Sequence, residues 1–337
     1  TLFPYLAVVN GRADDLRILD PSGDTVLISP GEAFALSVPV LAGPRFLASG
    51  SLRDGGAALL AVAGVGPVVQ LVSTWEDGTD PANGNVGPRV HSAVDLSMAP
   101  AGGGAPLAGP GAEILCMAAV PLPGPPSGSP PVAPAVAGRA LLLVGLSASG
   151  GASPAPGSLA VLEVQRQADG SVAAVASAPK PLGFDPVSLA LSPDGFHLYA
   201  ATPDPITDFT TWPPLPAART VQGVAEIDMS GGLAAPWPVR GLDARAPVPP
   251  AEAATRTAPT SLVAAAMVGE RLPGDSEHFS PPVLRVYAAL GRPGCGRDQP
   301  IECGVVTLDP ATGGLASDPA PPGARVPAHP YPTPPLA

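Results

Sequence analysis

The chain has 337 residues, of which 45% are hydrophobic and only 13% are charged. Glycine (40) and proline (49) together exceed a quarter of the residues, but the high hydrophobicity and low charge favour a folded domain over disorder. The net charge of −11 argues against binding to nucleic acid or anionic lipid, because both need clustered Lys and Arg.

The expected elements are short β-strands, each bounded by Gly, Pro, Asp or Asn. No stretch of ten residues shows a helical period without an internal Pro or Gly, so no helix is expected. No apolar segment reaches the roughly 18 residues of a membrane-spanning helix. In chain order, the predicted strands are residues 5–9, 16–19, 59–62, 68–72, 140–144, 159–164, 197–200, 224–227, 283–287 and 305–308.

The clearest unit is residues 187–202, which are typical of a strand, a tight turn and a second strand. Pro193 presets φ for the turn, while Asp194 supplies a side-chain acceptor and Gly195 tolerates positive φ. A third strand is predicted at residues 223–228, and residues 237–242 can give a fourth.

This pattern recurs along the chain. It returns at residues 5–23 and 283–313, with weaker copies at 47–75 and 114–170. Units of about four strands are the signature of propeller blades. The chain is therefore predicted to be one all-β domain over residues 1–337, a β-propeller of about five four-stranded blades. Aligned on the second strand of each unit, the repeats begin near Tyr5, Ala57, Arg139, Phe196 and Val283.

The spacing between repeats is uneven, which indicates inserted loops rich in proline. The expected insertions are residues 77–89, 124–137, 203–220, 244–258 and 271–282.

Three segments carry a family resemblance: Tyr5-Leu-Ala-Val-Val-Asn-Gly, Leu16-Arg-Ile-Leu-Asp and Leu191-Ser-Pro-Asp-Gly-Phe-His-Leu-Tyr-Ala-Ala. They resemble the YVTN-type β-propeller repeat, which is itself similar to the lactonase-like and YncE-like propellers. That family includes surface, periplasmic and cell-envelope proteins and a few enzymes. The resemblance implies a fold and a compartment, but no active-site residue.

Closure of the propeller raises two alternatives. The chain opens at what resembles the second strand of a blade, and the proline-rich tail at residues 331–337 can supply the missing first strand, as an edge strand only. The other reading is truncation, in which further blades lie beyond one terminus.

The cysteines bear on the compartment. Cys295 and Cys303 flank a segment with turn-forming ends, so a disulfide between them is expected; the alternative is two free thiols on a loop. Cys116 lies in an apolar run and is expected to be a buried small hydrophobe. The first residue is Thr1, which fits a cleaved signal peptide or lipoprotein signal. A periplasmic or extracellular location is expected, with an outer-membrane lipoprotein as one form of it.

The usual catalytic motifs are missing from the sequence. Lys180 precedes Pro181, so there is no phosphate-binding Gly-Lys-Ser/Thr. Gly145-Leu-Ser-Ala-Ser149 lacks the closing glycine of a nucleophile elbow. The four histidines form no spaced pair for a metal; His197 is placed on a strand, whereas His91, His278 and His329 are placed in loops.

One loop, residues 75–85, is rich in oxygen ligands. Its candidate Ca²⁺ ligands are Asp77, Asp80, Asn83 and Asn85, because Ca²⁺ takes six to eight oxygens. The spacing is not that of an EF-hand, and the alternative is a solvated turn whose polar side chains satisfy local backbone. No other cofactor is expected.

Two tryptophans, Trp75 and Trp212, fall at or inside predicted insertions and are candidate contacts for a protein partner. The alternative is that each covers the end of a blade. The sequence therefore favours a non-catalytic binding module or scaffold of the cell envelope, with protein partners and as a possible subunit of a larger assembly. The alternative is a lactonase-like hydrolase, which requires Glu, Arg and His to converge at one mouth of the central channel.

Overall fold

The protein is described by a computed structural model at residues 6–19, 37–51, 58–74, 89–99, 105–123, 135–148, 157–167, 171–177, 179–204, 206–207, 220–221, 223–244, 260–268, 282–290 and 304–316. Over these ranges the chain forms β-strands and turns. None of the described residues lies in a helix, and so none belongs to a helix that could cross a membrane.

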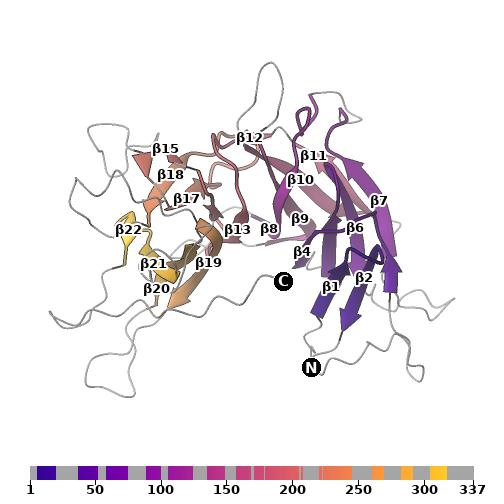
Figure 1. Cartoon of the computed structure of the whole chain (residues 1–337), viewed down its shortest axis with the longest axis horizontal. Coiled ribbons are helices and arrows are strands. Elements are labelled where there is room, and N and C mark those ends of the chain that lie inside the picture. Colours follow the sequence, from indigo (N-terminus) through magenta and orange to yellow (C-terminus); the bar gives the residue numbers. More distant parts are fainter. Residues whose placement is uncertain are drawn as a thin grey trace. The chain divides into compact units, whose positions relative to one another are not determined.

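The chain divides into two compact units, Thr1–Pro181 and Leu182–Ala337. The first unit holds three antiparallel sheets (Figure 1). Sheet 1 consists of β1 (Leu6–Asn10), β2 (Asp15–Leu19) and β3 (Ser37–Pro39). Sheet 2 consists of β4 (Phe46–Ser51), β5 (Ala58–Ala63), β6 (Val68–Thr74) and β7 (Arg89–Asp95). Sheet 3 consists of β8 (Ile114–Pro123), β9 (Ala135–Leu146), β10 (Ser158–Arg166) and β11 (Val172–Ala176), with β12 (Lys180–Pro181) paired to β10.

The second unit holds two four-stranded sheets and a ribbon. Sheet 4 consists of β13 (Ser188–Leu191), β14 (His197–Ala201), β17 (Gly223–Asp228) and β18 (Val239–Asp243). Sheet 5 consists of β19 (Thr260–Val268), β20 (Val283–Leu290), β21 (Gly304–Asp309) and β22 (Gly314–Leu315). The ribbon pairs β15 (Ile206–Thr207) with β16 (Thr220–Val221) and is inserted between β14 and β17.

The predicted all-β fold is confirmed, and every predicted strand overlaps an observed one. The repeat alignment is confirmed in four units, because Ala57, Arg139, Phe196 and Val283 fall within, or one residue before, the second strands β5, β9, β14 and β20. Tyr5 immediately precedes β1. The predicted insertion at residues 203–220 lies between β14 and β17 and contains β15 and the first residue of β16. The predicted insertion at residues 124–137 extends into β9, which begins at Ala135, and that at residues 77–89 ends on Arg89, the first residue of β7.

Sheet 2 is buried on both faces. On one face, Leu59 and Ala61 belong to a core shared with Leu142 and Leu162 of sheet 3. On the other face, Leu60 and Val72 pack with Leu16 and Val38 of sheet 1. Alternate residues of β5 thus enter two different cores, since successive strand side chains point to opposite faces. Sheets 1, 2 and 3 are therefore stacked in order, which a two-sheet sandwich does not allow.

The second unit repeats this packing between sheets 4 and 5. Tyr199, Val224 and Leu242 of sheet 4 share a core with Val286 and Leu308 of sheet 5. All five side chains are fully buried, so the contact removes a large apolar area from water.

Adjacent sheets approach most closely at their first strands. In the first unit β4 contacts β8, and in the second β13 contacts β19, whereas the last strands, β7 with β11 and β18 with β22, touch over much shorter stretches (Figure 1). A Cβ atom on Gly50 of β4 would lie only 2.8 Å from the Cβ atom of Ala119 on β8. Small residues are thus required where two sheets converge, and the sheets diverge toward their last strands.

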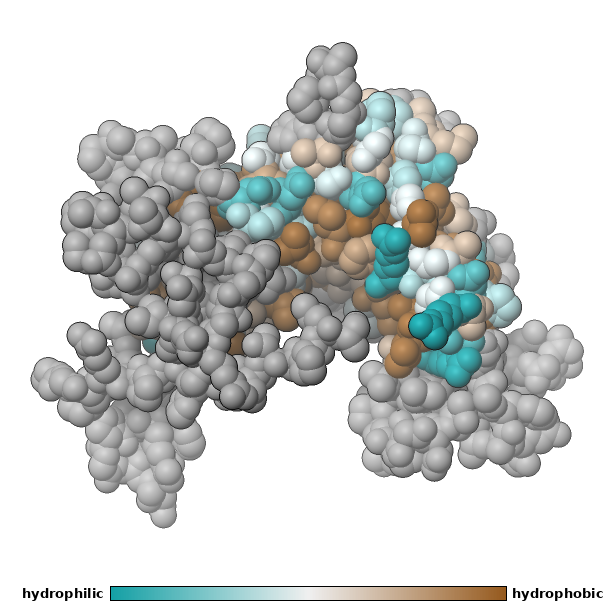
Figure 2. Space-filling view, in the orientation of Figure 1, coloured by the Kyte–Doolittle hydropathy of each residue, from teal (hydrophilic) through white to brown (hydrophobic). Residues whose placement is uncertain are grey.

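The described surface mixes hydrophobic and hydrophilic residues. Figure 2 shows brown groups between teal ones on the part of the first unit that is visible. With 13% charged residues, the chain has too few charges for a uniformly polar surface.

The closeness of β4 and β8 predicts the effect of one methyl group. Gly50→Ala should destabilise the protein by about 1–3 kcal/mol, because the new Cβ overpacks the contact with Ala119. Urea unfolding measures the loss. The double variant Gly50→Ala/Ala119→Gly should recover most of it, and a Gly50→Ala protein as stable as the parent would contradict this packing.

Candidate functional site

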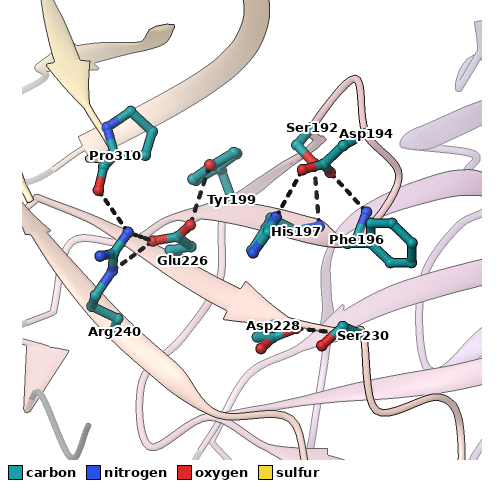
Figure 3. Close-up of polar contacts among 10 residues, drawn as sticks. All are labelled: Ser192, Asp194, Phe196, His197, Tyr199, Glu226, Asp228, Ser230, Arg240 and Pro310. Atoms are coloured by element: carbon teal, nitrogen blue, oxygen red, sulfur yellow. Dashed lines mark hydrogen bonds and ion pairs between the residues drawn. The ribbon is translucent and has the colours of Figure 1, made fainter. Parts of the chain in front are cut away.

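Among the buried or half-buried polar side chains of the described residues, three groups bring together residue types that can carry chemistry. The first is the β13–β14 hairpin, the second is a row across sheet 4, and the third joins sheets 2 and 3. Figure 3 shows the first two. Each is considered for the chemistry that its residue types permit.

The β13–β14 hairpin is closed by Asp194. The backbone N–H of Ser192 donates to the carbonyl of His197 at 2.8 Å, and Gly195 adopts a φ of 79° in the turn. Asp194 Oδ1 accepts from the N–H of Phe196 at 2.8 Å and from the Ser192 hydroxyl, while Asp194 Oδ2 lies 3.1 Å from His197 Nδ1 (Figure 3). The sequence-based assignment of a tight turn here is confirmed, with Asp194 as its side-chain acceptor.

Asp194 and His197 form an ion pair whenever His197 is protonated. Burial opposes ionisation of Asp194, but hydrogen bonds from His197, Ser192 and the Phe196 N–H outweigh it and lower the pKa of the carboxyl. The hydrogen bond to Asp194 raises the pKa of His197 against the opposing effect of burial, and the charges of Glu226 and Asp228 add to the rise. Each partner thus favours the charged form of the other.

Ser192, Asp194 and His197 are the residue types of a catalytic triad, but their order is different. In a triad the histidine accepts the serine proton, and the carboxylate orients the histidine. Here the Ser192 hydroxyl donates to Asp194, whose other oxygen holds His197. The Ser192 hydroxyl is therefore bonded to a carboxylate of lowered pKa and not to the histidine, and the three side chains stabilise a turn.

The row across sheet 4 consists of Tyr199, Glu226 and Arg240, which are directly opposite one another on β14, β17 and β18. Arg240 Nε donates to Glu226 Oε2 at 2.6 Å, and Arg240 Nη2 donates to the same oxygen and to the carbonyl oxygen of Pro310 at 2.8 Å. The Tyr199 hydroxyl lies 3.4 Å from Glu226 Oε1. Only 14% of the Arg240 side chain and 9% of the Glu226 side chain are exposed.

This row joins two sheets. Pro310 lies in the turn after β21 of sheet 5, 70 residues beyond Arg240, so the guanidinium connects sheet 4 to sheet 5. Burial and the negative charge of Glu226 raise the pKa of Tyr199, which keeps the phenol neutral and able to donate. The arrangement is a buried salt bridge that also bonds the Pro310 carbonyl, which is a structural role.

His91 is not in a loop, as the sequence suggested, but on β7, where 8% of it is exposed. The segment Arg89–Asp95 pairs with β6, and this places His91 on an inward-facing position. Its Nε2 lies 2.8 Å from the Ser73 hydroxyl oxygen, and its Nδ1 accepts a hydrogen bond from the Val172 N–H at 3.3 Å. The ring hydrogen is therefore on Nε2 and is donated to Ser73, so His91 cannot remove the proton of Ser73.

Several residues singled out from the sequence lie outside the described ranges. These are the candidate Ca²⁺ ligands Asp77, Asp80, Asn83 and Asn85, the candidate disulfide Cys295 and Cys303, the candidate partner contacts Trp75 and Trp212, and His278 and His329. Within the described ranges, no group of three or more His, Cys, Asp or Glu side chains could hold a metal ion.

One other expectation can be compared with the structure. Cys116 is buried, as expected, and burial raises the pKa of its thiol to about 12, so the thiolate does not form at neutral pH. Trp237 is also buried, and its indole N–H donates to the carbonyl of Gly232 at 3.0 Å. This tryptophan therefore covers a turn of sheet 4 instead of facing a partner.

The first strands of sheets 2 to 5 carry no acidic residue, basic residue or histidine. The strands β4, β8, β13 and β19 consist of Ala, Gly, Ser, Thr, Pro and larger apolar residues, with Cys116 among them. The line along which neighbouring sheets converge is thus apolar and made largely of small residues.

Comparisons with known proteins add little. No family model matches the chain, and no curated protein matches its sequence. Among solved structures, a chain of Kuenenia stuttgartiensis hydrazine synthase is similar at 15% identity, with a TM-score of 0.32, over 85% of this chain and 77% of that chain. A likeness at this TM-score supports neither a fold nor a function.

The buried pair of Arg240 and Glu226 predicts a large effect of removing one partner. Arg240→Met should cost about 3 kcal/mol of unfolding free energy in urea, because the Glu226 carboxylate is left buried without a counter-charge. Arg240→Met/Glu226→Gln should recover part of that loss. Arg139→Met is the matched control, since Arg139 pairs with Glu163 at 42% side-chain exposure and should cost less than about 1 kcal/mol. Equal losses for Arg139→Met and Arg240→Met would contradict this assignment.

The ion pair of the hairpin predicts a pH window. The raised pKa of His197 gives stability below about pH 6.5 that is lost as the pH rises through the folded pKa. The lowered pKa of Asp194 gives stability above about pH 4 that is lost as the pH falls. His197→Gln should therefore destabilise the protein more at pH 5.5 than at pH 8.5, by less than about 1 kcal/mol because both side chains are one-third exposed. Urea unfolding at the two pH values checks it, and a loss that is larger at pH 8.5 would have the wrong sign.

Proposed function

We propose that this chain is a non-catalytic β-propeller that works outside the cytoplasm and presents loops to protein partners in the cell envelope. The single observation that carries the proposal is the way the sheets pack. Within each unit, consecutive antiparallel sheets are stacked face to face and converge at their first strands.

This packing is what propeller blades require. A blade is a four-stranded antiparallel sheet whose strands follow one another in sequence, and its first strand lies nearest the central channel. Sheets 2 and 4 and sheet 5 have that strand order, and sheet 3 adds one short strand to it. Under this proposal sheet 1 is a blade that lacks one strand, and the tail at residues 331–337 or further blades complete the ring.

A binding role fits the polar chemistry of the described residues better than catalysis does. The Ser192 hydroxyl donates to the Asp194 carboxylate in a turn, the Val172 N–H donates to His91 beside Ser73, and burial raises the pKa of the Cys116 thiol. The lactonase-like alternative needs Glu, Arg and His to converge at a channel mouth, and no described observation favours it.

The ribbon β15–β16 supports a role for the loop that contains Trp212. Ile206 and Val221 are buried, and a Cβ on Gly241 of β18 would lie 1.8 Å from a methyl carbon of Val221, so the ribbon rests directly on sheet 4. The chain is thus anchored on both sides of residues 208–219. An aromatic residue in a segment that is held at both ends suits a partner contact.

The envelope location rests on composition and on the predicted Cys295–Cys303 disulfide, which would persist in an oxidising compartment. The low charge and the many prolines equally suit a subunit of a larger envelope assembly. Peptide mapping of the unreduced protein tests the disulfide directly.

The binding role predicts a selective effect of Trp212. The full chain, cross-linked in envelope extract from its source, should capture a specific protein partner, and Trp212→Ala should weaken the measured affinity for the purified partner at least tenfold. Trp75→Ala tests the second candidate contact in the same way. Met98→Ala, at an apolar residue that is 65% exposed, is the control and should bind normally.

Two outcomes would contradict the proposed function. The first is the absence of any partner whose affinity depends on Trp212 or Trp75. The second is hydrolysis of a lactone panel by the parent protein, which would establish the enzyme alternative instead.

A further inference from the structure

The outer edge of sheet 3 is formed by β11, which pairs with β10 on one side and with no other strand that the structure describes. Hydrogen bonds at the two ends of this pairing show which peptide groups face β10. The Gln167 N–H donates to the Ser171 carbonyl at 2.7 Å, and the Ser177 N–H donates to the Val161 carbonyl at 2.9 Å. Because bonded residues alternate along an antiparallel pair, every second residue between Ser171 and Ser177 also faces β10.

The remaining residues of β11 direct their N–H and C=O groups away from the sheet. They are Val172, Ala174 and Ala176. The Val172 N–H agrees with this assignment, because it donates to His91 Nδ1 at 3.3 Å and not to β10. The peptide groups of Ala174 and Ala176 follow on the same side, where no described strand pairs with them. These two residues therefore present donors and acceptors in the arrangement that a further β-strand requires.

The strand β11 differs from the last strands of the other sheets in what it places at its edge. Charged residues, prolines and very short strands protect an edge from pairing with another chain. The last described strand of sheet 1, β3, contains Pro39, and β22 of sheet 5 has two residues. The last strand of sheet 2, β7, contains Arg89 and Asp95, and β18 of sheet 4 contains Arg240 and Asp243. The five residues of β11, Val-Ala-Ala-Val-Ala, include none of these features.

We propose that β11 is a self-association edge, which pairs antiparallel with β11 of a second copy of this chain about a two-fold axis at Val175. In this register Ala174 of each copy lies opposite Ala176 of the other. Both are outward-facing residues, so each of the two pairs exchanges both of its N–H···O bonds. Val172 is not needed for these bonds and keeps its contact with His91. Sheet 3 of one copy and sheet 3 of the other then form one continuous sheet.

The side chains of β11 favour a second copy over an unrelated strand. Val175 is 56% exposed, and at the axis it meets its own copy at a position where two strands hold no mutual hydrogen bonds and side chains are closest. The edge is thus complementary to itself in both hydrogen bonds and apolar contact, as a two-fold interface requires.

The charge of the chain sets how strong this pairing can be. The strand β11 contributes no charge to the contact, but each copy carries a net charge of −11, so the two copies repel each other at longer range. A contact made by one short strand against this repulsion gives a weak dimer. Added salt screens the repulsion and should strengthen it.

Sedimentation equilibrium of the full chain tests the pairing. The parent protein should show a monomer–dimer equilibrium, and Val175→Lys should raise its dissociation constant at least tenfold, because two ammonium groups then face each other across the axis. Val305→Lys is the matched control, since it places the same charge at a valine that is 51% exposed on β21, and it should dimerise as the parent does. A parent protein that stays monomeric up to its solubility limit, or equal losses for the two variants, would overturn the proposal.

A pair of opposite charges gives the second readout. Val175→Glu alone should dimerise as poorly as Val175→Lys, whereas an equimolar mixture of the two variants should form a heterodimer, since only there do unlike charges meet at the axis. Native mass spectrometry distinguishes the heterodimer by its mass. A mixture without heterodimer would show that Val175 does not lie at the axis. Neither readout involves the partner proposed above, so the self-association edge and the proposed function can fail independently.

Discussion

The burial of both faces of a narrow apolar sheet is the constraint on which this structure depends. Residues 58–63 read Ala-Leu-Leu-Ala-Val-Ala, with no polar side chain to face water on either side. Such a strand is stable only between two other sheets, so sheet 2 needs sheet 1 on one face and sheet 3 on the other. The same requirement joins sheets 4 and 5. The apolar composition of these strands therefore favours a stack of successive sheets over a single pair of sheets.

Buried polar residues of the described ranges refine this stacking. Where apolar packing is closest, as at Gly50 and Ala119, only small residues fit. Farther from the first strands, a few buried polar side chains hydrogen-bond one sheet to the next. Arg240 donates to the Pro310 carbonyl, and His91 accepts from the Val172 N–H. A buried hydrogen bond has strict geometry and is costly to leave unmade, so each bridge fixes how one sheet sits against the next.

The sequence allowed the strands with hydrophobic runs and strong turns to be predicted, and it placed the second strand of four sheets correctly. It did not reveal β19, whose run Thr-Ser-Leu-Val-Ala-Ala-Ala-Met-Val lacks turn residues and is rich in alanine, a poor strand signal. His91 was misplaced because its strand, Arg-Val-His-Ser-Ala-Val-Asp, has only two large apolar residues. The row of Tyr199, Glu226 and Arg240 was missed because it depends on the register of three strands. The only sequence signal for such a row is a single charged residue within an otherwise apolar strand.

The packing constraints on the strands explain why the side chains of the strands indicate little about function. The strands at the convergence line must be small and apolar to approach one another, and those between two sheets must be apolar on both faces. Neither position can carry an unpaired charge or a free nucleophile without weakening the stack. Under the proposed binding function, recognition is assigned to the chain segments between strands. The ribbon β15–β16 is consistent with that assignment, since Ile206 and Val221 are buried against sheet 4 on either side of the segment that contains Trp212.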